Sequence, residues 1–159
     1  MTTSPTPRPS EAEPGADLAA WDATLAAEQQ AVFGYQVVAA QLRADDDPAA
    51  EPAAADLSRH RRRQDLAAAQ LGRLGAPPAA APPAYALPGP VTDTRAAADL
   101  AATLEQACAQ AYADLVAAAE PAQRALPAGW LVAAALAETR WAGAVPPLPG
   151  LDGRSPSPG

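Results

Sequence analysis

Four side chains that can bind a metal ion stand inside apolar, helix-forming stretches of this sequence. They are Glu28, His60, Glu105 and Glu138, and His60 is the only histidine of the chain. Steps of three and four residues place each of them on the apolar stripe of a helix. An ionised carboxylate buried without a partner is costly, so cations or hydrogen-bond donors must compensate the three glutamates. One solution is a single divalent metal, iron, manganese or zinc, held by these four side chains.

Two tyrosines accompany these carboxylates at a repeated spacing. Residues 28–35 read EQQAVFGY and residues 105–112 read EQACAQAY, so a tyrosine follows each Glu-Gln pair by two helical turns. We expect Tyr35 and Tyr112 to donate hydrogen bonds that orient the carboxylates across the bundle. Cys108, three residues after Glu105, could add a soft ligand, although a lone core cysteine usually acts as a small hydrophobe.

A core without metal is the alternative that the sequence leaves open. The carboxylates would then pair with His60, with the tyrosine hydroxyls or with an inward arginine such as Arg63 or Arg140. The protein would be a non-catalytic bundle that binds itself or another protein. The basic run RHRRR at residues 59–63 predicts solvated helix edges, because helical spacing spreads its arginines over both flanks of the stripe.

Four long stretches rich in Ala, Leu, Gln, Glu and Arg predict the helices that position these side chains. We expect helices over about residues 17–43, 52–75, 92–119 and 121–143. Asp93 or Thr92 is suited to cap the third helix, and Pro127 is expected to kink or delay the fourth. No alternating strand pattern competes, so the predicted fold class is all-α.

The second connection, APPAAAPPAYALPGP at residues 76–90, is longer than most helix-to-helix turns. An extended proline-rich chain of this length reaches roughly 45 Å, whereas a helix of about 24 residues is roughly 36 Å long. The segment can therefore cross the whole bundle and let the second and third helices run parallel. A disordered linker between two hairpins is the alternative.

Composition limits the classes of function. The chain has 159 residues, a net charge of -7, one cysteine and no lysine, and its apolar runs are too short to cross a bilayer. We therefore expect no disulfide, no membrane span and no general affinity for nucleic acid. There is also no glycine-rich phosphate loop and no nucleophile turn, so no enzyme class is predicted.

The organisation expected along the chain is one bundle between two tails. Residues 1–16 and 149–159 read as disordered tails around a bundle at residues 17–148, and the start of the chain lacks a secretory signal, which indicates a cytoplasmic protein. Exposed aromatic residues near the bundle ends, Trp130 or Phe33, are expected to drive homodimer formation.

The helical region, about residues 17–143, resembles the ferritin-like superfamily. The stretches that carry the resemblance are LAAEQQAVFGYQVVAAQL, SRHRRRQDL, APPAAAPPAYALPGPVTD, LEQACAQAYADLVAA and GWLVAAALAETRWAGAVPPLPGL. Together they look like a ferritin-like family of actinobacterial proteins for which no activity is established. The resemblance implies a four-helix bundle with one long crossover between helices 2 and 3.

The resemblance also implies a ligand set, which this sequence keeps only in part. Glu28, His60, Glu105 and Glu138 match ligands of the di-iron members. Where the second helix of those members carries a glutamate this chain has Leu57, and where the fourth carries a histidine it has Trp141. The departures argue against a pair of irons and leave a site for one metal.

Overall fold

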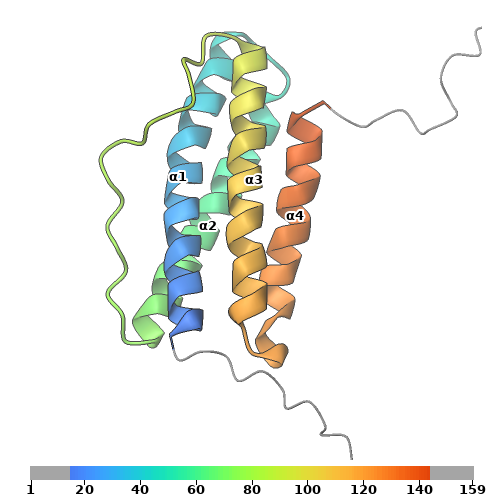
Figure 1. Cartoon of the computed structure of the whole chain (residues 1–159). Helices are drawn as coiled ribbons and strands as arrows, with labels where there is room; N and C mark the ends of the chain where they lie inside the picture. The colour runs from blue at the N-terminus through green and yellow to red at the C-terminus, as the bar shows by residue number, and fades with distance from the viewer. Residues whose placement is uncertain (1–14, 144–159) are drawn as a thin grey trace, which may run out of the picture.

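Four long α-helices make up most of the protein in the computed structural model, which describes residues 15–143. They are α1 (Ala16–Ala44), α2 (Ala50–Arg73), α3 (Thr94–Ala118) and α4 (Ala125–Trp141), and a short 3-10 helix, η1 (Pro121–Gln123), precedes α4. The helices lie side by side along their length (Figure 1), and no strand occurs among the described residues. The predicted all-α class with four helices is confirmed. The predicted tails lie almost wholly outside the described residues.

Local signals explain where the helices begin and end. Asp93 caps α3, since its side chain accepts a hydrogen bond from the backbone N–H of Ala96 at 2.8 Å. α2 ends at Arg73, and Gly75 follows it with φ of 80°, a conformation that glycine adopts without strain. α4 starts at Ala125, later than predicted. Its start places Pro127 in the first turn, where the missing N–H has no helical partner to lose.

The segment between α2 and α3, residues 74–93, runs the length of the molecule along the outside of α1 (Figure 1). As a result α2 and α3 point in the same direction. Gln29 of α1 holds the segment, because its Nε2 donates to the carbonyl oxygen of Ala79 at 2.8 Å. The ring of Phe33 packs against that of Tyr85, with centroids 5.6 Å apart. The expectation that Phe33 is exposed was wrong, because this segment partly covers it.

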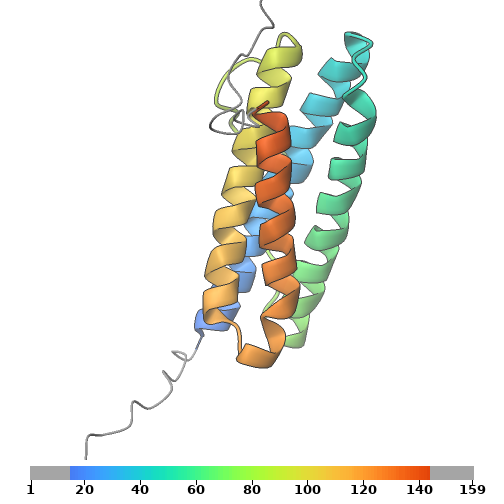
Figure 2. The same cartoon turned by 90° about the vertical axis from the view of Figure 1, so that its right-hand side faces the viewer.

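The helices pack in the order α2, α1, α3, α4, with close backbone contact between successive members of that series (Figures 1 and 2). The central pair, α1 and α3, packs closely at Gly34 of α1. A Cβ atom at this position would lie 2.5 Å from Cδ1 of Leu104 on α3. Gly34 therefore sets the spacing of the two helices that carry Glu28 and Glu105.

Replacing Gly34 with alanine is expected to lower the free energy of unfolding by up to about 2 kcal/mol, because overpacking against buried Leu104 outweighs the gain in helix propensity. Gly72→Ala is the matched control. A Cβ there meets nothing within 4 Å, so the same change is expected to stabilise by about 0.5–1 kcal/mol. Urea unfolding of both variants measures the difference. Equal effects at the two positions would contradict the close α1–α3 approach.

Trp130 belongs to the interior of the described bundle. Its ring meets those of Trp21 and Tyr112 edge-on, with centroids 6.1 and 5.6 Å away, and the residue is 8% exposed. The expectation that Trp130 is exposed was therefore wrong. α4 turns it inward together with Ala134, Ala137 and Trp141. Within residues 15–143, no helix combines the length and apolar character that a membrane crossing needs.

Candidate metal centre

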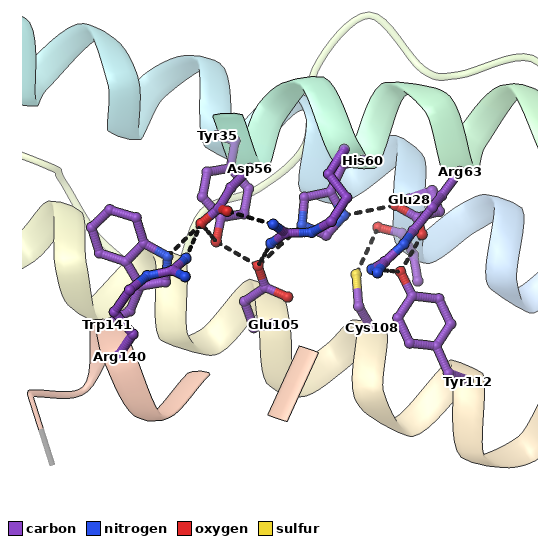
Figure 3. A network of polar contacts seen from close by, with 12 residues as sticks. Glu28, Tyr35, Asp56, His60, Arg63, Glu105, Cys108, Tyr112, Arg140 and Trp141 are labelled. Atoms are coloured by element: carbon purple, nitrogen blue, oxygen red, sulfur yellow. Dashed lines mark hydrogen bonds and ion pairs between the residues drawn. The ribbon is translucent and has the colours of Figure 1, made fainter. Parts of the chain in front are cut away.

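A connected group of buried polar side chains occupies the middle of the bundle (Figure 3). α1 supplies Glu28 and Tyr35, α3 supplies Glu105 and Tyr112, and α2 supplies His60. All five side chains are fully buried. Three of the four sequence-predicted ligands, Glu28, His60 and Glu105, are thus brought together by three different helices.

The two tyrosines exchange partners between α1 and α3. Tyr35 donates its hydroxyl hydrogen to Oε1 of Glu105 at 2.7 Å, and Tyr112 donates to Oε1 of Glu28. Burial is the main cause that raises the pKa of both phenols, and the neighbouring carboxylates raise it further. The hydroxyls therefore stay protonated as donors. The repeated spacing has a structural reason, since each tyrosine binds the glutamate of the other helix.

His60 lies between two carboxylates. Its Nδ1 is 2.8 Å from Oε2 of Glu28, and its Nε2 is 3.2 Å from Oε1 of Glu105. An ionised carboxylate only accepts hydrogen bonds, so two carboxylates at the two ring nitrogens favour the doubly protonated, cationic imidazole. Burial by itself lowers the pKa of His60, but hydrogen bonds with Cys108, Glu105 and Glu28 raise it to about 11.

The charge of His60 acts back on Glu105. Burial by itself would raise the pKa of the Glu105 carboxyl, but the hydrogen bond and charge of His60, followed by the hydrogen bond of Tyr35, lower it. Glu105 Oε1 also lies 3.2 Å from a guanidinium nitrogen of Arg59. Its other oxygen, Oε2, is buried and has no hydrogen-bond partner among the described residues.

Asp56 is a buried carboxylate that was not among the residues expected in the core. It is 2% exposed. Its carboxylate forms ion pairs with Arg59, at 2.7 Å from Nη1, and with Arg140, and it accepts a hydrogen bond from the indole Nε1 of Trp141 at 2.9 Å. The spacing between Asp56 and His60 in the sequence could have predicted its burial. Asp56 stands four residues before His60 and so shares its helix face, whereas Leu57 is turned partly away.

Arg63, which the alternative without metal named as an inward arginine, is a second polar residue on the buried face of α2. Its guanidinium donates to the hydroxyl oxygen of Tyr112 at 3.0 Å, and its carbon lies 5.1 Å above the Tyr112 ring. Arg63 is 5% exposed, so the interpretation of this part of the basic run as a solvated edge was wrong. The observed inward face of α2 is Ala53, Asp56, His60, Arg63, Ala67 and Leu71.

Glu138 does not join the group. It is half-buried, and within residues 15–143 its side chain makes no hydrogen bond or ion pair with Glu28, His60 or Glu105. The expectation that Glu138 points into the core was wrong, because Ala137 rather than Glu138 is buried on this turn of α4.

Cys108 of α3 lies beside Glu28 and His60 and offers a third ligand atom. A carboxylate oxygen of Glu28, a ring nitrogen of His60 and the sulfur of Cys108 all lie within 4.8 Å of one another. The thiol is buried, and burial raises its pKa. Oxygen, nitrogen and sulfur in one buried cluster form a mixed donor set of the kind that binds transition metals.

A pair of bridged metal ions does not fit this arrangement. Glu138 is absent from the cluster, and the carboxylate of Asp56 is already surrounded by Arg59, Arg140 and the Trp141 indole. These guanidinium groups supply the positive charge that a second metal would bring. The described residues therefore leave a donor set for one ion, at Glu28, His60 and Cys108.

Comparison with known proteins places the chain but assigns no activity. The family model described as a domain of unknown function (DUF4439) matches residues 20–153. Among solved structures, a conserved hypothetical protein from the actinobacterium Mycobacterium tuberculosis is 32% identical, with a TM-score of 0.76 over 82% of this chain and 98% of that chain. A search of curated proteins finds no match.

Proposed function

This chain belongs to the DUF4439 family of domains of unknown function, and we propose that it binds one divalent metal ion in the core of a ferritin-like bundle. The observation that carries the proposal is the convergence of Glu28, His60 and Cys108 from three helices, with ligand atoms within 4.8 Å of one another. Facing helices of bundles are where such centres are built. The unpartnered Oε2 of Glu105 is a further buried acceptor of the same group.

Zinc suits this donor set best among iron, manganese and zinc. A thiolate favours soft or borderline metals over manganese, and zinc commonly accepts carboxylate, imidazole and thiolate ligands together. Three protein ligands would leave one position for water or a small molecule. A bound zinc ion acts as a Lewis acid and lowers the pKa of a water in that position.

Binding must displace protons, because the ligands of a metal are deprotonated. The two carboxylates favour a doubly protonated His60 and burial favours the thiol form of Cys108, so both residues would have to lose a proton to act as ligands. Tyr112 then keeps Glu28 oriented through its hydroxyl, and Glu105 keeps the second nitrogen of His60 as a donor.

The ferritin-like relationship rests on connectivity as well as on residues. The long segment at residues 74–93 joins two helices that run in the same direction, which is the single-crossover arrangement of that fold (Figure 1). A glutamate on α1, a histidine on α2 and a glutamate on α3 meet in the core, as the sequence resemblance implies.

The metal content of protein purified without chelator is expected to be about one zinc per chain. Cobalt(II) added to the metal-free protein should give the visible absorption of a cobalt–thiolate bond. Cys108→Ser should abolish that absorption and lower the affinity, while the helical circular dichroism stays unchanged. Glu138→Gln is the matched control, since this carboxylate lies outside the cluster.

Thermal melts give a second readout of the same prediction. A metal that binds only the folded state stabilises it by about 2.7 kcal/mol at a free concentration one hundred times Kd. Wild type and Glu138→Gln should melt at higher temperature with zinc than with chelator, and Cys108→Ser should not. If the melt of wild type is the same with zinc, iron, manganese and chelator, the metal proposal is wrong.

A second candidate function is a non-catalytic bundle with a self-neutralised core. It is favoured by the arginines, because Arg59, Arg63 and Arg140 reach the network formed by the three buried carboxylates. Under this alternative the polar residues specify how the helices pack, and no ion binds. The metal-independent melt described above is the result that would favour it.

A further inference from the structure

α4 is apolar on its outward side as well as on its buried side. The apolar part of its outer face consists of Ala125, Ala128, Gly129, Val132, Ala135 and Leu136, and Thr139 and Arg140 follow on the same side in the last turn. Val132 is 59% exposed and Leu136 is 68% exposed, the largest exposures among the big apolar side chains described. A stretch of helix that is apolar all round, as α4 is from Ala125 to Ala137, is normally buried on every side. The outer face of α4 therefore indicates a surface that another molecule covers.

Within the described chain nothing covers this face. α4 makes backbone contacts with α3 and with η1, and in Figure 2 its outer side is turned toward the viewer without another described element above it. The side chains that α4 directs toward α2, such as Trp141, come from its inner side. The exposed leucine and valine are thus contiguous and unpartnered.

Gly129, in the interior of α4, has no explanation inside the chain. Its φ is not positive, and a Cβ there would meet no atom of the described residues within 4 Å. Glycine in a helix interior lowers stability relative to alanine, so the position carries a cost without an internal benefit. Glycine at this position would be favourable if a backbone or a large side chain of another molecule packs closely against it.

We propose that the outer face of α4 pairs with the same face of a second copy of this chain, with the two α4 helices antiparallel about a two-fold axis near Val132. Leu136 and Gly129 are seven residues apart, which is two turns along one side of the helix. An antiparallel copy places Leu136 of each chain over Gly129 of the other. The protruding Leu136 and the space left by Gly129 lie on the same surface of each chain, as an isologous interface requires.

The contact between two copies must overcome a net charge of -7 on each chain, which opposes self-association. The six apolar residues add no like-charge pair to that repulsion, because none of them is charged. Antiparallel packing also opposes the dipoles of the two helices. Because one helix face is smaller than the roughly 1,600 Å² of a standard interface, we expect a dimer that dissociates on dilution.

Sedimentation of the full chain over a range of concentrations tests this proposal. Wild type is expected to pass from monomer to dimer, and Val132→Glu, which sets two carboxylates against each other at the axis, should weaken dimerisation at least tenfold. Leu74→Glu is the matched control, because Leu74 is an exposed leucine, at 39%, beyond the end of α2. Circular dichroism checks that both variants remain helical.

A cysteine placed at the axis tests the orientation. Two copies of Val132→Cys face each other, and a disulfide between them should form under mild oxidation. Leu126→Cys should not cross-link, because antiparallel helices separate the two positions by about 18 Å along the axis. The native Cys108 is buried and does not interfere.

Three results would overturn the proposal. They are a monomer at every concentration, a dimer that survives Val132→Glu, and cross-linking at both engineered positions, which indicates parallel helices. The first would point to another occupant of the face, such as residues 144–159 of the same chain or a different protein.

Discussion

Replacing His60 with leucine is expected to lower the free energy of unfolding by about 3–5 kcal/mol, the range for breaking a buried ion pair by removal of one partner. The imidazolium lies between Glu28 and Glu105 at 2.8 and 3.2 Å, and all three side chains are fully buried. Leucine has a similar volume, so the loss reports the uncompensated charge of the two carboxylates rather than a cavity. Urea unfolding in the presence of chelator measures it without any contribution from a bound metal.

A second substitution separates the charge effect from a packing effect. Glu28→Gln in the His60→Leu background should recover part of the loss, because an amide carries no charge and can still accept the hydrogen bond from Tyr112. Glu138→Gln, outside the network, should change the stability by less than about 0.5 kcal/mol. If His60→Leu proves as stable as wild type, the ion pairs across the core contribute nothing and the central role of His60 is refuted.

The inward stripes of α1 and α3 could be predicted from the sequence because large apolar side chains mark one face. Leu25, Tyr35 and Leu42 on α1 and Tyr112 and Leu115 on α3 are buried as expected. Their three- and four-residue spacing predicted that Glu28 and Glu105 lie on the same buried faces. The exchange of partners between the tyrosines could not be predicted, because it depends on the relative shift of the two helices.

The faces of α2 and α4 were less predictable because alanine marks no side of a helix. In α2, Asp56 and Arg63 point inward while Leu57 and Gln64 are only half-buried, so the polarity of a side chain does not mark the buried face of this helix. These two polar residues are stabilised in the core by partners on other helices, Trp141 and Tyr112. Partners far apart in sequence cannot be paired from one sequence alone.

The same partners explain why the core does not require a metal to be neutral. Arg59 and Arg140 contact Asp56, and His60 contacts both glutamates. A metal at Glu28, His60 and Cys108 would therefore replace protons on His60 and Cys108 rather than fill an uncompensated site. Its binding should strengthen as the pH rises, whereas the metal-free core should weaken.

The stability of the metal-free protein is expected to fall as the pH rises from 7 to 9. The pKa of His60 is raised from 6.5 to about 11 in the folded state by hydrogen bonds that outweigh burial. A raised pKa contributes stability that is fully present below pH 6.5 and is lost progressively as the pH rises toward 11. The slope for one proton is at most about 1.4 kcal/mol per pH unit, so roughly 3 kcal/mol should be lost over this window.

The window ends at pH 9 because other groups contribute above it. Burial raises the pKa of Cys108 and of both core tyrosines, so their ionisation in the unfolded chain destabilises the fold at higher pH. At the acid end, the lowered pKa of Glu105 means that its contribution is lost as the pH falls below about 4.5.

His60→Gln isolates the contribution of the imidazolium, since glutamine is polar, close in size and does not titrate. Urea unfolding at pH 7, 8 and 9 with chelator should give a declining free energy for wild type and a nearly constant one for the variant. At pH 7 the variant should be the less stable of the two, and the gap should narrow with each pH unit. Parallel lines for the two proteins would show that His60 is neutral in the core. The carboxyl group of either Glu28 or Glu105 would then have to be protonated, because an oxygen of each lies at one of the two ring nitrogens of His60.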